Sequence, residues 1–206
     1  LAIQEGLAQY ELDAKKARFL RPETNLRKKV EEAVAAKAEN PWLKALQGWH
    51  VRLPDVRWPL AMVVSSDAKQ TIVGLKDGTT YQLRGGPAGA IKTLKLYDVV
   101  YVRPHRSGKS ANTAELRFIP QVQAAAIVME NSTGRIVGMS GGFSHYLSSY
   151  NRAVRMLRQP GSVIKPLTYW AALTEGIQPN TLILDNPVTI APLPGQVESW
   201  NPDNYG

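Results

Sequence analysis

The sequence predicts an α+β chain in which helices come first, a small β-barrel follows, and a β-hairpin with one more helix comes last. Three observations predict this order. Residues 1–39 show helical periodicity, residues 60–119 alternate with a period of two, and residues 158–174 return to helical spacing after a Pro-Gly break. The chain has 206 residues and 44% of them are hydrophobic, so it can bury a core.

Residues 1–48 are predicted to form a helical linker. One helix is expected over residues 1–18, where the apolar side chains make one stripe: Ile3, Leu7, Tyr10 and Ala14. A second is expected over residues 26–39, up to a break at Asn40-Pro41. Neither stripe is strongly apolar, so we expect both helices to pack on a part of the protein before Leu1.

Residues 49–119 are predicted to form a small barrel of the OB-like kind. Five short strands with glycine-rich connections are expected: Leu60–Val64, Thr71–Leu75, Thr79–Leu83, Asp98–Arg103 and Ala114–Ile119. The turn at residues 76–78 makes the second and third strands a hairpin. Trp42, Trp49 and Trp58 lie at the start of this segment and are expected to pack in a core or between domains.

The last part begins with a predicted hairpin over residues 124–140 that turns at residues 131–134. A flexible polar stretch, Ser144 to Tyr150, leads towards a helix that begins near Ser162. Residues 177–206 are rich in Pro, Asn and Asp and are expected to be surface loop.

Residues 158–166, RQPGSVIKP, carry the chemistry with the most specific context. If a helix begins here, Ser162 and Lys165 lie on one face, one turn apart. The same spacing occurs at Ser66 and Lys69, but there it lies in a polar stretch between two strands and predicts a solvated turn. After Ser162 the apolar residues recur at helical spacing, so we expect a buried face that anchors the first turn.

A serine hydroxyl becomes a nucleophile only beside a base, and Lys165 can be that base when part of it is neutral. Arg158 is a candidate for a nearby positive charge, and the Ser162 amide is a candidate oxyanion donor. Pro166 has no N–H to give to the Ser162 carbonyl, so the first turn should be irregular. The alternative is a plain N-cap serine and a surface lysine.

Composition excludes several classes of site. The chain has no cysteine, so it has neither disulfides nor cysteine metal sites, and His50, His105 and His145 lack metal-ligand spacing. No apolar run is long enough for a membrane span, and the start at Leu1 suggests a piece of something longer. The net charge of +8 is scattered, and the basic segment 106–110 is interpreted as a loop rather than a phosphate site, so no nucleic acid is expected.

From residue 120 the order of motifs resembles the opening of the transpeptidase domain of a class A penicillin-binding protein. The resemblance rests on a hairpin with Thr133-Gly134 in its turn and, further on, the segments 141–142, 150–153, 158–166 and 200–205. Residues 1–119 resemble, more weakly, the linker and OB-like domain of that family. The resemblance implies an incomplete transpeptidase domain over residues 120–206, made of the hairpin and the helix of the nucleophile.

The resemblance also implies a function. The parent would be a bifunctional glycosyltransferase and transpeptidase, anchored in the bacterial inner membrane with its active sites on the periplasmic face. It would cross-link stem peptides ending in D-Ala-D-Ala, be acylated by β-lactams, and need no cofactor or metal. Ser162 would be the nucleophile, Lys165 its proton acceptor, and Trp200 and Tyr205 would line the substrate groove.

Two further motifs of the family, Ser-x-Asn and Lys-Thr-Gly, do not occur between Lys165 and Gly206. We therefore expect this fragment alone to be inactive. Two alternatives remain open: a non-catalytic envelope binding module, and another penicillin-recognising serine enzyme such as a D-Ala-D-Ala carboxypeptidase.

Overall fold

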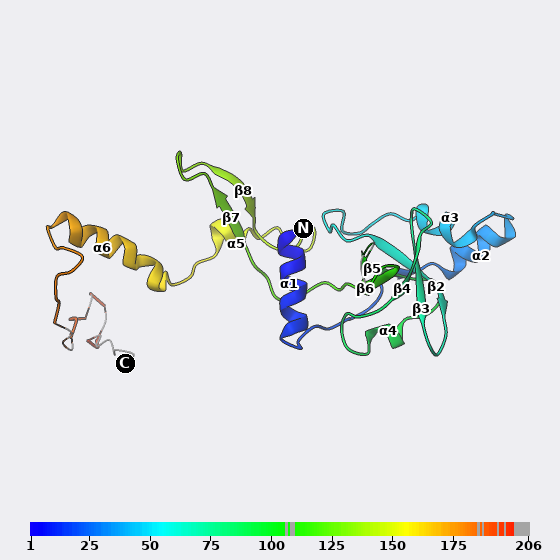
Figure 1. The fold of residues 1–206 in the computed structure, drawn as a ribbon, viewed down its shortest axis with the longest axis horizontal. Helices are drawn as coiled ribbons and strands as arrows, with labels where there is room; N and C mark the ends of the chain where they lie inside the picture. Colours follow the sequence, from blue (N-terminus) through cyan, green and yellow to red (C-terminus); the bar gives the residue numbers. More distant parts are fainter. Residues whose placement is uncertain are drawn as a thin grey trace. The chain divides into compact units, whose positions relative to one another are not determined.

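The computed structural model describes residues 1–105, 107, 110–184, 186, 188–192, 194–195 and 197–199 (Figure 1). The chain divides into two compact units, Leu1–Met156 and Leu157–Gly206. No helix in the described ranges is both long and apolar enough to cross a membrane.

The first helix differs from its prediction. α1 spans Ala2–Asp13 rather than residues 1–18, because the chain turns at Lys15, where φ is 54°. Tyr10 and Ala14 are exposed, and the buried face is a different one: Gln4, Leu7, Ala8 and Glu11. Leu7 and Ala8 join the chain's own core, so α1 packs on the residues that follow it.

The second predicted helix, residues 26–39, is shorter than expected and ends at Ala35. The short strand β1 (Thr24–Asn25) is followed by α2 (Arg27–Ala35), and α3 (Pro41–Gln47) begins at the predicted break. The Asn40 side chain accepts the Leu43 N–H at 3.3 Å, and Pro41 stands in the first turn, where no N–H is needed. The dipeptide is therefore the start of α3, whereas α2 has already ended at Ala35.

Five strands close into a barrel, as the sequence predicts. They are β2 (Leu60–Ser66), β3 (Thr71–Leu75), β4 (Thr80–Leu83), β5 (Asp98–His105) and β6 (Thr113–Leu116), with α4 (Ala90–Thr93) between β4 and β5. The order is β5-β2-β3-β4-β6, and β6 pairs back onto β5. The β4–β6 pair is parallel and the other pairs are antiparallel.

Strand alternation divides the apolar side chains between two clusters. Successive residues of a strand point to opposite faces. Val100 and Val102 of β5 therefore join a cluster to which all five strands contribute, the barrel interior. Val99 and Tyr101 join a second cluster outside it, together with residues of α1, α2 and α3.

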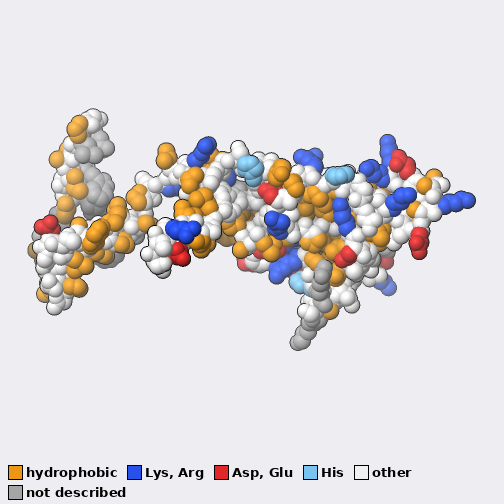
Figure 2. Space-filling view, turned by 90° about the horizontal axis from the view of Figure 1, so that it is seen from above, with side chains coloured by type: hydrophobic (Ala, Val, Ile, Leu, Met, Phe, Trp, Pro, Cys, Tyr) orange, Lys and Arg blue, Asp and Glu red, His pale blue; other side chains and the backbone are white. Residues whose placement is uncertain are grey.

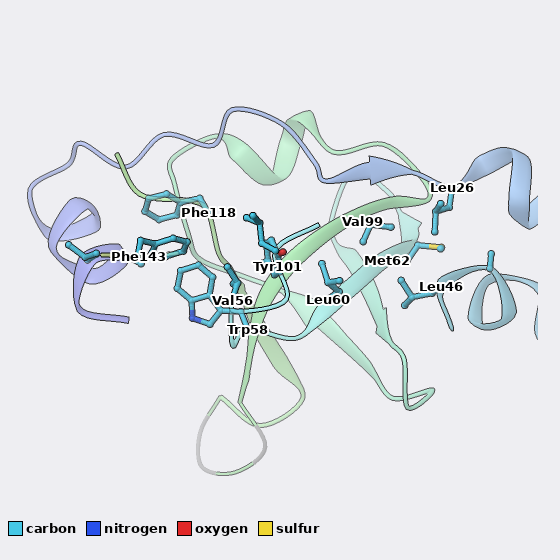
Figure 3. Packing of buried hydrophobic residues seen from close by; sticks show 14 of the residues in the cluster. Leu26, Leu46, Val56, Trp58, Leu60, Met62, Val99, Tyr101, Phe118 and Phe143 are labelled. Atoms are coloured by element: carbon cyan, nitrogen blue, oxygen red, sulfur yellow. The ribbon is translucent and has the colours of Figure 1, made fainter. Parts of the chain in front are cut away.

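Trp58 belongs to this outer cluster and lies near Phe143 and Tyr101, as Figure 3 shows. Its ring lies 6.4 Å from that of Tyr101 and 5.5 Å from that of Phe143. Trp42 and Trp49 pack against the same cluster, which confirms the prediction that these tryptophans serve packing. Glycine is needed at position 74 of β3 because the Trp42 ring occupies the space that a Cβ would take.

A buried ion cluster fastens α1 to the barrel. Arg117, just after β6, is 1% exposed, donates from Nη2 to Glu5 at 2.9 Å, and forms an ion pair with Glu115 at 3.2 Å. The other Glu5 oxygen accepts the Trp58 indole N–H at 2.6 Å. A charge this deeply buried is tolerated only when it is paired, so Glu5 and Arg117 require each other.

The predicted second hairpin is confirmed. β7 (Ala126–Met129) and β8 (Ile136–Ser140) pair antiparallel, and Gly134 in the turn has a φ of 70°. Every residue of β7 is exposed. Among the described residues the hairpin pairs with no other strand.

In the second unit, the 3-10 turn η1 (Gly161–Ile164) runs directly into α6 (Lys165–Thr174). No residue of η1 or α6 is buried. Figure 2 shows hydrophobic side chains uncovered along this helix.

Candidate functional site

The candidate nucleophile lies on a tight turn. Ser162 is the second residue of η1 and Lys165 is the first residue of α6, so the two are separated by one turn. Gly161, with a φ of 53°, brings the chain into this turn through a left-handed conformation.

The irregular first turn predicted from Pro166 is present. The Ser162 carbonyl accepts the N–H of Lys165, three residues on, rather than a bond from residue 166. Proline cannot donate, so the shorter 3-10 bond takes its place. The consequence is local: the serine is held in a 3-10 turn and the lysine begins the α-helix.

The expected burial of this helix is wrong for the described residues. Ile164 is 49% exposed, Leu167 57% and Trp170 67%, so the apolar face has the predicted spacing but no cover. Ser162, Lys165 and Arg158 are exposed as well. The described residues therefore neither bury the lysine nor enclose the serine beside it.

The other predicted site residues cannot be placed. Trp200 and Tyr205 lie outside the described residues, and so do three members of the basic loop, Arg106, Gly108 and Lys109. The second Ser-x-x-Lys is an exposed turn between β2 and β3, in which the Asp67 carboxylate accepts the amides of Lys69 and Gln70 at 2.7 and 2.8 Å. The interpretation of that spacing as a turn is confirmed.

The segment at residues 150–153 packs on the pair of glycines after β8. The Asn151 side chain caps the short helix α5 (Arg152–Arg155) by accepting the Ala153 N–H at 3.0 Å. The Arg152 amide donates to the Gly141 carbonyl at 3.1 Å, and a Cβ on Gly141 would overlap Asn151. Glycine is needed at 141 because the chain returns so closely there.

Sequence reasoning missed one polar junction entirely. Asp55, in the loop before β2, accepts the Ser144 hydroxyl at 2.8 Å and the His145 amide at 2.6 Å. The side-chain amide of Gln4 donates to the carbonyls of Asp55 at 2.9 Å and Phe143 at 3.0 Å. The stretch expected to be flexible is therefore anchored at its start: Phe143 and Ser144 are buried.

The histidines offer no metal site in the part of the chain that the structure describes. His105 lies 3.9 Å from Glu115, and the ring of His145 packs at 6.2 Å from that of Tyr146.

Comparison with known proteins identifies relatives for this arrangement. Residues 124–206 match the family model for the penicillin binding protein transpeptidase domain. Penicillin-binding protein 1A of Rickettsia felis is 34% identical over 158 residues, which are 73% of this chain and 19% of that protein. Penicillin-binding protein 1A of Rickettsia bellii is 30% identical over 211 aligned residues, 94% of this chain and 26% of that protein.

A crystal structure of penicillin-binding protein 1A from Haemophilus influenzae has a similar fold. It matches with a TM-score of 0.58 and 25% identity, over 98% of this chain and 28% of that one. This chain therefore spans between 19% and 28% of the length of these proteins. The matches do not favour a non-catalytic binding module or a carboxypeptidase.

Proposed function

Because this chain belongs to the class A penicillin-binding proteins, we propose that it is part of an enzyme that cross-links peptidoglycan stem peptides by serine acyl transfer. The observation that carries the proposal is the placement of Ser162 and Lys165, one turn apart at the start of α6, inside the segment matched by the transpeptidase model.

The proposed chemistry has two steps. Lys165 Nζ takes the proton of Ser162 Oγ, which attacks the carbonyl of the penultimate D-Ala. The peptide bond to the terminal D-Ala breaks, its nitrogen receives the proton from Lys165, and D-Ala leaves as an amine. The acyl group then passes from Ser162 to the amine of a second stem peptide, and the hydroxyl is restored. A β-lactam acylates the same oxygen by opening its ring, because it mimics the terminal dipeptide.

Two conditions must be met in the active protein. Lys165 must be neutral to take the proton, and burial or a nearby positive charge such as Arg158 favours the neutral amine. The developing oxyanion needs two donors, and the Ser162 amide is our candidate for one of them. We assign Trp200 and Tyr205 to substrate binding.

The wider context is also proposed. The parent protein would be bifunctional, with a glycosyltransferase beside this transpeptidase. It would be anchored in the inner membrane, face the periplasm, and use neither metal nor cofactor. Its substrates are proposed to be stem peptides that end in D-Ala-D-Ala.

We assign residues 49–119 to an OB-like domain, residues 1–48 to the linker before it and residues 120–206 to the transpeptidase domain. The support is topological. Around the ring the barrel strands follow the order β2-β3-β4-β6-β5. The β4–β6 pair is parallel, and the helix α4 lies between β4 and β5 in the chain. A closed five-stranded Greek-key barrel of this kind is the OB architecture.

The test is acylation by a fluorescent penicillin in the complete protein that contains this chain. Ser162→Ala should abolish labelling, and Lys165→Ala should slow it at least a hundredfold, in the usual range for loss of a general base. The matched controls are Ser66→Ala and Lys69→Ala, which alter the same spacing in an exposed turn and should leave labelling unchanged. Labelling that persists in Ser162→Ala would refute the assignment.

A further inference from the structure

A cavity of about 320 Å³ lies between the connection after α1, β5 and the segment that follows β6. Its apolar lining includes Phe19, Leu53, Val100 and Phe118. This volume is at the lower end of the range of small-molecule sites, about 300–1,000 Å³. The candidate nucleophile does not line the cavity, and nothing in the proposed acyl transfer uses it.

Besides Arg117, three arginines line this cavity: Arg18, Arg21 and Arg52. All three are exposed, and none forms a hydrogen bond or ion pair through its side chain with any described residue. The acid beside them is Glu23, which Arg21 and Arg52 reach only through longer-range electrostatics. The cavity therefore has an apolar lining and an excess of unpaired positive charge.

Two polar side chains that also line the cavity have unused hydrogen-bonding groups. The hydroxyl of Tyr101 and the Nε and Nη1 groups of Arg117 are buried and bond to no residue that the structure describes. Buried donors without partners are rare in proteins and each calls for an explanation. Burial also raises the pKa of Tyr101, so the phenol keeps its proton and stays a donor.

We propose that this cavity binds a carboxylate carried on an apolar body, with Arg21 and Arg52 pairing with the carboxylate and the side chains around Leu53 and Phe118 covering the apolar part. Arginine suits this role because its planar guanidinium binds carboxylates through two parallel hydrogen bonds. The same chemistry is offered by an acyl chain and by the C-terminus of an apolar peptide.

Glu23 does not prevent the arginines from pairing with a bound carboxylate. It is partly buried, and desolvation raises its pKa despite the two arginines. A bound ligand would remove more water and favour the neutral carboxyl further. The arginines would then be free to pair with the ligand.

The test uses the complete protein and a photoreactive probe, decanoate with a diazirine on its chain, followed by peptide mapping. We expect labelling within residues 18–23, 52–53, 100–101 or 117–121, and at least tenfold less with the matching decanamide probe. Two competitors distinguish the sources: unlabelled decanoate, and acetyl-Leu-Leu with a free or an amidated C-terminus. The competitor that reduces labelling more shows whether the site prefers an acyl chain or a peptide C-terminus.

Variants separate binding from folding. Arg21→Ala/Arg52→Ala should reduce specific labelling at least tenfold, whereas Arg21→Lys/Arg52→Lys should retain part of it. The matched control is Arg84→Ala/Arg155→Ala, two exposed arginines that do not line the cavity, and it should behave as the parent protein. Equal labelling by the decanamide probe, or labelling mapped only to other segments, would overturn the proposal. Penicillin acylation is read separately, so its failure would not be confused with this one.

Discussion

Removal of the Glu5 carboxylate should destabilise the first unit substantially. In Glu5→Ala, Arg117 keeps Glu115 at 3.2 Å but loses its closest partner at 2.9 Å, while remaining 1% exposed. Breaking a buried ion pair costs about 3–5 kcal/mol, and the remaining Glu115 places this case near the lower end. The Trp58 N–H also loses its acceptor, worth about 1–3 kcal/mol if it were counted alone. Since the two losses share one side chain, we expect about 3 kcal/mol in total.

The assay is urea unfolding at pH 7 followed by tryptophan fluorescence, to which the buried Trp58 contributes. Glu5→Gln keeps an acceptor without the charge and should cost about 1–2 kcal/mol. The matched control is Asp13→Ala on the same helix, which removes an exposed contact with Gln9 and should cost less than about 0.5 kcal/mol. If Glu5→Ala unfolds within 1 kcal/mol of this control, the buried arginine does not depend on Glu5 and the reasoning is wrong.

Three other predictions test separate features. Gly74→Ala should cost about 1–3 kcal/mol in urea unfolding, because the added Cβ overlaps the Trp42 ring, whereas Gly89→Ala meets no neighbouring atom and tests only the positive φ of its turn. Burial raises the pKa of Glu23, so the folded state binds more protons than the unfolded one from about pH 4.3 up to that raised pKa. Stability should therefore fall as the pH rises through this window, and Glu23→Gln should lack that part of the slope; an unchanged slope would contradict the pKa shift. Asp55→Asn removes one of two acceptor oxygens and should speed hydrogen exchange at the His145 amide, where unchanged protection would argue against the junction.

Patterns within single elements could be predicted because they depend on local rules. The five barrel strands have a period of two, and each observed strand overlaps its predicted range. The 3-10 turn at Ser162 follows from the missing N–H of Pro166, which is a covalent fact. The hairpin at residues 124–140 follows from two apolar runs around a turn with glycine.

Errors arose where a polar residue is buried by partners far away in sequence. The buried face of α1 contains Gln4 and Glu11, which an apolar stripe does not reveal. Their partners, the carbonyls of Asp55 and Phe143 and the amides of Gln121 and Val122, lie more than fifty residues away. No local pattern contains that information.

Ser162 and Lys165 show most clearly which features depend on the local sequence and which depend on the tertiary structure. The sequence by itself determined that these two residues stand one turn apart, that Pro166 makes the turn irregular, and that a barrel precedes them, because covalent structure and periodicity act over a few residues. Only the tertiary structure decided what α1 buries, how Asp55 holds the stretch after Phe143, and that the apolar face of α6 is uncovered among the described residues. Burial is a property of what surrounds a residue, and those surroundings are assembled from distant parts of the chain.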